Sequence, residues 1–168
     1  MTQIKLQRVQ ETDLTWLLDL RQEDNWMHHI TPVSLETQKQ WYASLATATP
    51  FPRQWCFCGY QQHDALKSNI GYFYFQNIDW INRKADVSWA LRKEFRGEGM
   101  GKKLVAAGRD FAKDYLNLRR LDAEILSPNE PSRACAEAAG FVHEGTKRKA
   151  VVRHGEAYDS LVFGLLFD

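Results

Sequence analysis

The amino-acid sequence predicts a single α/β domain, residues 1–168, in which helices cover the faces of one mixed sheet. Segments with strand periodicity and helix periodicity follow one another in the order β-α-α-β-β-β-α-β-α-β-β. No internal repeat, linker or low-complexity segment interrupts that order. The 168 residues are enough to bury one substantial hydrophobic core.

The chain begins with a predicted strand and a predicted helix. Residues 4–9 alternate apolar and polar side chains, as a half-buried strand does. Thr12 or Asp13 can then cap a helix whose apolar residues continue to about residue 21. Residues 22–33 show no clean period, so we expect a loop or a broken helix there.

A second helix and an antiparallel hairpin are predicted next. Ser34 is a good N-cap for a helix over residues 35–46, whose apolar stripe includes two aromatic residues. Two β-rich runs, residues 55–61 and 69–77, are separated by the polar residues 63–68. That spacing favours a hairpin.

The second half of the chain alternates strands and helices. Residues 85–91 predict a strand, and apolar residues at helical spacing follow from Gly101 to about residue 118. Residues 120–126 predict another strand, and a short helix then runs to Ala139. The last two strands are predicted over residues 141–152, with an irregularity at Gly145, and 158–167, and the glycine at position 140 ends the preceding helix.

Three glycines within five residues mark the junction between the strand over residues 85–91 and the helix that follows. Gly97, Gly99 and Gly101 lie in a segment, residues 92–103, in which basic side chains outnumber acidic ones. Glycine reaches positive φ and lets backbone amides approach a ligand, and the helix N-terminus adds partial positive charge. The segment therefore predicts a phosphate cradle, although a glycine-rich turn can also be a plain connector.

Composition narrows the class of protein. The 22 basic and 21 acidic residues leave a formal charge of +1, which gives no general attraction for nucleic acid or membrane. No run approaches the roughly 20 apolar residues of a membrane span, so we expect a cytoplasmic protein. The cysteines are Cys56, Cys58 and Cys135, and they lack a second pair at zinc-ligand spacing. We expect buried free thiols and no metal site.

The order of elements, with Arg96-x-x-Gly99-x-Gly101 after the fourth strand, resembles the GNAT superfamily of N-acetyltransferases. The resemblance extends through Asn129-x-x-Ser132, Gly140-Phe141, Glu144-Gly145, Arg148 and Tyr158-Asp159. It implies a mixed, mostly antiparallel seven-stranded sheet flanked by about four helices. It also implies that the fourth and fifth strands splay apart to admit acetyl-CoA.

The resemblance assigns one set of residues to acetyl-CoA. The fourth strand would present backbone groups to the pantetheine arm, and the loop amides would bind the pyrophosphate. The implied cofactor-binding residues are Trp89, Ala90, Leu91, Arg96, Gly97, Glu98, Gly99, Met100, Gly101, Lys102, Asn129 and Ser132. Lys102 is equally well read as an ordinary solvated side chain.

The acceptor side is implied by weaker similarities. Segments around Trp16–Arg21, Asn25–Met27 and Pro32–Glu36 are similar to enzymes that acetylate amines of nucleotide-linked sugars. The C-terminal pattern is similar both to those and to ribosomal-protein N-terminal acetyltransferases. The loop between the first two helices lines the acceptor side in this fold. The candidate substrate-binding residues are Trp26, Met27, His28 and His29, with solvent-facing histidines and core-filling aromatics as the alternative.

Acetyl transfer to an amine needs a proton acceptor, an oxyanion stabiliser and a proton donor for the thiolate. Asp86 is the best-placed carboxylate for the first role, or else a surface ion pair. A backbone N–H of residues 89–91 is expected to meet the oxyanion. Many family members carry a tyrosine where this chain has Ala136, so Ser132 is the substitute candidate for proton donation, unless it caps its helix.

These observations lead to one functional hypothesis and two rivals. The hypothesis is an acetyl-CoA-dependent N-acetyltransferase acting on a small-molecule amine, with a nucleotide-linked amino sugar as the leading acceptor. The rivals are an N-terminal acetyltransferase of ribosomal or other proteins and a non-catalytic CoA-binding module. An apolar stripe on the last two strands is compatible with a homodimer.

Overall fold

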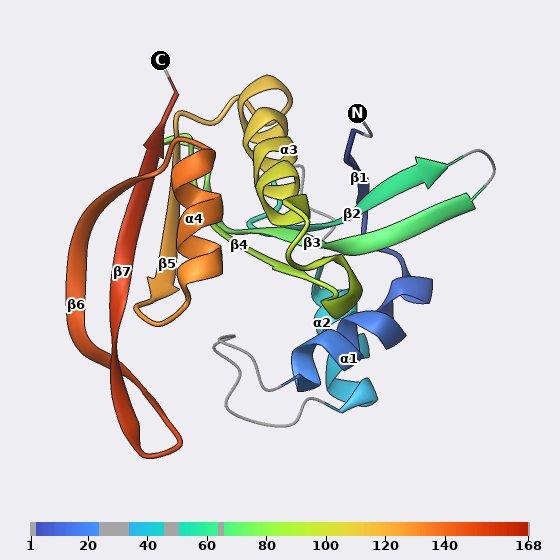
Figure 1. Cartoon of the computed structure of the whole chain (residues 1–168). Helices are drawn as coiled ribbons and strands as arrows, with labels where there is room; N and C mark the ends of the chain where they lie inside the picture. Colours follow the sequence, from blue (N-terminus) through green and yellow to red (C-terminus); the bar gives the residue numbers. More distant parts are fainter. Residues whose placement is uncertain (1–2, 24–33, 46–50, 64–65, 168) are drawn as a thin grey trace.

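The computed structural model describes residues 3–23, 34–45, 51–63 and 66–167, and within these ranges it contains seven strands and four α-helices (Figure 1). The elements are β1 (Lys5–Arg8), α1 (Leu14–Gln22), α2 (Leu35–Leu45), β2 (Trp55–His63), β3 (Leu66–Asp79), β4 (Lys84–Leu91), α3 (Met100–Asp114), β5 (Arg120–Leu126), α4 (Glu130–Ala138), β6 (Val142–Arg153) and β7 (Glu156–Leu166). Two 3₁₀ turns, Glu11–Asp13 and Lys93–Phe95, precede α1 and α3. The predicted order of strands and helices is confirmed.

The strands form one mixed sheet in the order β1-β2-β3-β4-β5-β7-β6. Every neighbouring pair is antiparallel except β4 and β5, which are parallel. A parallel pair needs a crossover connection, and α3 supplies it. In this order β4 is the central strand, so the parallel pair lies at the middle of the sheet, between β1–β3 on one side and β7 and β6 on the other.

The helices cover the two faces of the sheet in pairs. Figure 1 shows α3 and α4 on one face and α1 and α2 on the other. The alternation of side chains along β3 explains this arrangement, because Phe73 and Phe75 point into the core under α3 while Tyr72 and Tyr74 point toward α1 and α2. Each face thus has its own buried cluster.

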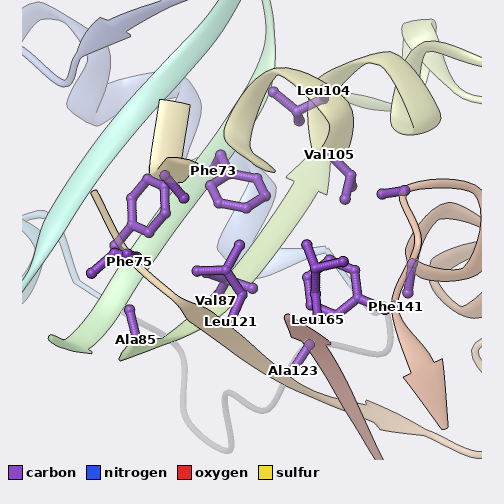
Figure 2. Packing of buried hydrophobic residues seen from close by; sticks show 14 of the residues in the cluster. Phe73, Phe75, Ala85, Val87, Leu104, Val105, Leu121, Ala123, Phe141 and Leu165 are labelled. Atoms are coloured by element: carbon purple, nitrogen blue, oxygen red, sulfur yellow. The ribbon is translucent and has the colours of Figure 1, made fainter. Parts of the chain in front are cut away.

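The core beneath α3 and α4 is the larger of the two clusters. Figure 2 shows Phe73 of β3 below Leu104 of α3, and Val87 of β4 beside Leu121 of β5, in the same cluster. Gly108 lets the helix approach, since a Cβ there would lie 2.5 Å from the Phe73 ring. The close packing fixes the N-terminus of α3 against the sheet, directly beside the glycine-rich loop.

Several boundaries differ from the sequence prediction. Strands β2 and β3 extend to His63 and from Leu66, so the polar stretch predicted as a loop is mostly strand. The apolar pattern of α3 continues to Leu118, although the helix ends at Asp114, because Leu116 and Leu118 still point into the core while Tyr115 is exposed. The predicted irregularity at Gly145 is confirmed as a shift in the β6–β7 register between His143 and Gly145.

The described helices are all too short or too polar to cross a membrane. The three cysteines are free thiols, as predicted, and Cys56 and Cys58 are buried beneath α1 and α2.

Candidate functional site

Strands β4 and β5 separate after a short paired stretch. Their parallel pairing covers only three positions, of which the last joins Asp86 to Asp122. Beyond that point β4 continues to Leu91 alongside β3, and β5 continues to Leu126 alongside β7. The two strands therefore leave a split in the sheet whose edges carry backbone groups without a strand partner, as the predicted fold required.

The N–H groups of β4 that face this split can be identified from the strand alternation. Arg92 N–H donates to Ile70 O of β3 at 2.9 Å, so its side of the strand faces β3. Neighbouring residues of a strand point their N–H groups to opposite edges. The amides of Leu91 and Trp89 consequently face the split. They belong to two of the three residues that the sequence assigned to the cofactor arm and to the oxyanion; the amide of the third, Ala90, faces β3 instead.

The loop after β4 takes conformations that require glycine. Gly97 and Gly99 have φ values of 87° and 74°, which lie in the left-handed region. A Cβ at either position would meet no atom within 4 Å, so open space lies on that side of the loop. The glycines are thus needed for backbone conformation, and the space beside them is free for a ligand.

The first amides of α3 are available to an anion. The first hydrogen bond of the helix runs from Lys103 N–H to Gly99 O at 3.3 Å, and Gly99, the N-cap, has no side chain to satisfy earlier donors. The N–H groups of Met100, Gly101 and Lys102 precede that bond. A Cβ at Gly101 would lie 2.7 Å from Cys135 Sγ, so glycine also keeps α3 close to α4. Loop and helix together form a cradle that suits a pyrophosphate.

The arginines of this loop are partly engaged by other groups. Arg96 donates to Leu91 O at 2.7 Å and pairs with Glu23 at 2.5 Å, at the C-terminal end of α1. Arg92 pairs with Glu94 at 2.7 Å. Within the described residues Lys102 forms no ion pair. The backbone amides and Lys102, rather than the arginines, are therefore the donors most open to an anion.

The N-terminus of α4 lies on the same face of the sheet as α3. Asn129 is its N-cap, and its Oδ1 accepts from Ser132 N–H at 3.2 Å. The capping role that was the alternative for Ser132 thus belongs to Asn129. Ser132 is half-buried, and no hydrogen bond of its hydroxyl is found within the described residues.

Ala136 differs from Ser132 in being part of the core. Its side chain is fully buried in the cluster beneath α3 and α4. A tyrosine at this position would have to displace core residues. The role of Ala136 is therefore to fill the core. Proton donation to a departing thiolate cannot come from this side chain.

Asp86 lies where the split begins, on the face opposite Ser132. It alternates with Ala85 and Val87, which point into the core, so its exposed carboxylate is on the face covered by α1 and α2. Asn77 Nδ2 donates to Asp86 Oδ2 at 2.7 Å. The split therefore separates the two candidate catalytic groups, one on each face of the sheet.

A buried polar group lies beneath α1 and α2, next to this face. Arg21 donates to Gln38 Oε1 at 2.7 Å, and its guanidinium lies 4.4 Å from the ring centroid of Trp41. Trp41 Nε1 donates to the Tyr74 hydroxyl at 3.2 Å. Burial raises the pKa of the Tyr74 hydroxyl above its ordinary value. The hydroxyl therefore stays neutral in the physiological range.

Two parts of the prediction have a different outcome. Trp26, Met27, His28 and His29, the candidate substrate-binding residues, lie outside the described residues. Arg21 ends the Trp16–Arg21 segment that carries the acceptor resemblance, but neither Arg21 nor Gln38 was given a role from the sequence. The sequence did contain a sign that Gln38 is buried, because this polar residue lies on the same helical stripe as Trp41 and Leu45.

No group of three or more metal-ligating side chains comes together within the described ranges.

The Acetyltransferase (GNAT) domain family matches the chain over residues 3–142. Among curated proteins, the chain is 34% identical over 102 residues to the putative ribosomal N-acetyltransferase YdaF of Bacillus subtilis, covering 59% of this chain and 54% of that protein. It is 29% identical over 82 residues to the spermidine N(1)-acetyltransferase of Vibrio cholerae, covering 49% of this chain and 47% of that protein. The alignments thus span about half the length of each relative.

A solved structure gives a longer match. The crystal structure of spermidine N-acetyltransferase from Vibrio cholerae in complex with CoA and spermine superposes with a TM-score of 0.86, covering 98% of this chain and 95% of that chain. The two sequences are 23% identical over this superposition. At that identity the likeness concerns the fold alone.

Proposed function

The chain belongs to the GNAT acetyltransferase family, and from that premise we propose that it transfers an acetyl group from acetyl-CoA to the primary amine of a small molecule. The observation that carries the proposal is the split between β4 and β5, which opens beside a glycine-rich loop with unused amides. A plain connector would need neither the strand separation nor the open space beside Gly97 and Gly99.

Acetyl-CoA supplies the acyl group as a thioester. The amides of residues 97–102 would hold its pyrophosphate, with Lys102 adding charge at the same end of α3. The edge of β4 would orient the pantetheine arm, and Asn129 and Ser132 of α4 would contact it from the other side. These residues fit such a ligand because the amides at the N-terminus of α3 are donors and the first turn of that helix carries no acidic side chain.

The chain's own groups can then serve the proton transfers. An alkyl amine with a pKa of about 10 is mostly protonated at neutral pH, so a carboxylate or a water relay has to accept its proton. Asp86 would take that role; its position where the split opens, on the face of α1 and α2, supports it. The amides of Trp89 and Leu91 would stabilise the oxyanion, and Ser132 would donate a proton on the opposite face.

The leading acceptor remains the amine of a nucleotide-linked sugar. A small-molecule amine is supported by the spermidine acetyltransferases among the relatives and solved structures. The sugar is supported by the sequence similarities around α1 and α2.

An N-terminal amine of a protein is a second candidate. The relative named as a putative ribosomal N-acetyltransferase favours it, being 34% identical to this chain where the two align. A peptide acceptor would need an extended path to Asp86, which a panel of peptide substrates can test.

A non-catalytic CoA-binding module is the third possibility, and buried Ala136 in place of a proton-donating tyrosine favours it. A homodimer is also part of the proposal. Strand β6 forms an edge of the sheet and carries exposed Val142 and Val152, which suit an apolar contact with a second copy.

The experiment is a panel of amines assayed with acetyl-CoA for release of free thiol. Amino sugars and their phosphates, polyamines and short peptides are compared, while CoA binding is measured separately by calorimetry. We expect turnover with at least one small-molecule amine. Tight CoA binding without turnover on any amine would instead identify a binding module, and turnover restricted to peptides would favour the N-terminal amine.

A further inference from the structure

The contact between α1 and α2 holds a positive charge that no described carboxylate balances. Arg21, in the last turn of α1, hydrogen-bonds through Nη1 to Gln38 Oε1 at 2.7 Å and stacks over Trp41. Within the described residues no ion pair neutralises its guanidinium. A partly buried cation held by a neutral amide and an aromatic ring is a group that can receive an anion.

Gln38 adds a second donor at the same place. Its side chain is fully buried, and its Nε2 has no hydrogen-bond partner among the residues that the structure describes. The orientation of the amide is fixed, because a guanidinium can only donate and the amide oxygen must therefore face Arg21. A buried amide donor without an acceptor is destabilising, and an apolar residue on this stripe of α2 would avoid that cost.

The two donors lie near the face of the sheet that carries Asp86. The guanidinium of Arg21 lies over the ring of Trp41, whose Nε1 donates to the Tyr74 hydroxyl of β3 at 3.2 Å, so the contact lies above β3. Tyr74 pairs with Ser88 of β4, the strand that borders the split. An anion at Arg21 would therefore lie on the face that carries Asp86, above the strand next to the split.

We propose that Arg21 and Gln38 form an anion subsite for the acceptor, which is therefore an amine whose skeleton also carries a phosphate or carboxylate group. Arg21 supplies the charge and a planar pair of donors, and Gln38 Nε2 supplies a neutral donor beside it. The inference rests on the proposed function for the amine, but the anion subsite is testable without turnover. It separates this chain from a polyamine acetyltransferase, because a polyamine has no anionic group to offer.

The first experiment measures anion binding directly. Inorganic phosphate and acetate are titrated, separately, into the wild-type protein while the Arg21 Nε–H and Gln38 side-chain amide signals are followed by NMR. We expect both sets of signals to shift saturably, with the tighter of the two ions identifying phosphate or carboxylate as the preferred group. Signals that do not respond to either ion would overturn the proposal.

Matched variants locate the effect. Arg21→Gln removes the charge, and Gln38→Glu places a carboxylate beside Arg21 that would occupy it and repel an anion. Lys39→Gln removes an exposed cation one residue along α2 and is the control. We expect binding to be lost in the first two variants and retained in the third. Equal binding in all three would show that the ion is held elsewhere.

The second experiment measures acceptor choice with glucosamine 6-phosphate and glucosamine as a matched pair. We expect wild-type kcat/KM to favour the phosphate, and Arg21→Gln to reduce that preference by about tenfold or more, mainly through KM. Unchanged preference in Arg21→Gln would contradict the subsite. If no amine were turned over at all, the proposed function would fail, and the ion titration would still decide whether the subsite exists.

Discussion

The polar groups on the two faces of the split differ in kind: they are mainly backbone groups on one face and side chains on the other. On the α3–α4 face, the donor site consists largely of backbone, held in place by Gly97, Gly99 and the first amides of α3. On the α1–α2 face, the polar groups are side chains that come together from separate segments, as Arg21 and Gln38 do. A backbone site tolerates changes of side chain but not of conformation, whereas a side-chain site depends on each residue. If the proposed sites are right, the choice of acetyl donor depends on backbone conformation and the choice of acceptor depends on individual side chains.

The largest expected effect is on the side-chain face. In Asp86→Asn the amide oxygen can still accept the hydrogen bond from Asn77 Nδ2, but the side chain can no longer act as a base. We therefore expect kcat to fall by about a hundredfold or more. Asp122→Asn is the matched control, because Asp122 is the partner of Asp86 across β4 and β5 but pairs with Arg120 at 2.5 Å. Steady-state kinetics with the best amine of the panel decide this. Equal losses in both variants would remove Asp86 from the chemistry.

The next effect tests conformation on the backbone face. Gly99→Val forces a branched side chain to φ 74°, a conformation that costs an L-residue about 1–2 kcal/mol or more. We expect the dissociation constant for CoA, measured by calorimetry, to rise by roughly fivefold to thirtyfold or more because the loop must change shape. Gly155→Val is the control, since Gly155 has φ 81° and equally open space but lies in the β6–β7 turn. It should lose similar stability while keeping CoA affinity.

A smaller effect is expected from side chains on the backbone face. Arg96→Met removes the exposed pair with Glu23 and the bond to Leu91 O, and Lys102→Met removes an exposed cation. Exposed charges contribute about 0–1 kcal/mol, so each variant should weaken CoA binding by no more than about tenfold. Calorimetry at two salt concentrations measures this. Losses larger than that of Gly99→Val would reverse the contrast between the two faces.

The smallest effect concerns stability at alkaline pH. Burial beneath α1 and α2 raises the pKa of the Cys56 thiol from 9.0 to about 12, with a smaller opposing influence from Arg21. The thiol ionises more readily in the unfolded chain, so its contribution is complete below pH 9 and is lost as the pH rises toward 12. Urea unfolding at increasing pH should therefore show a steeper fall for wild type than for Cys56→Ala. Parallel falls would show that the thiol does not contribute.

The sequence predicted the backbone face better than the side-chain face, for physical reasons. Glycine and strand periodicity are local signals, so the loop, the helix after it and the order of elements could be read along the chain. The pairing of Arg96 with Glu23 joins residues 73 positions apart and has no local signal. Arg21 and Gln38 meet only because α1 and α2 pack together. The roles of Asp86, Ser132 and the loop residues stay predictions.

The most direct test follows the backbone amides themselves. An amide NMR titration with CoA reports every N–H at once, without altering the protein. We expect the largest saturable shifts at residues 97–102 and at Trp89 and Leu91, with little change at the amides of α2. The largest shifts elsewhere, with residues 97–102 unmoved, would contradict the assignment of this split and loop to acetyl-CoA.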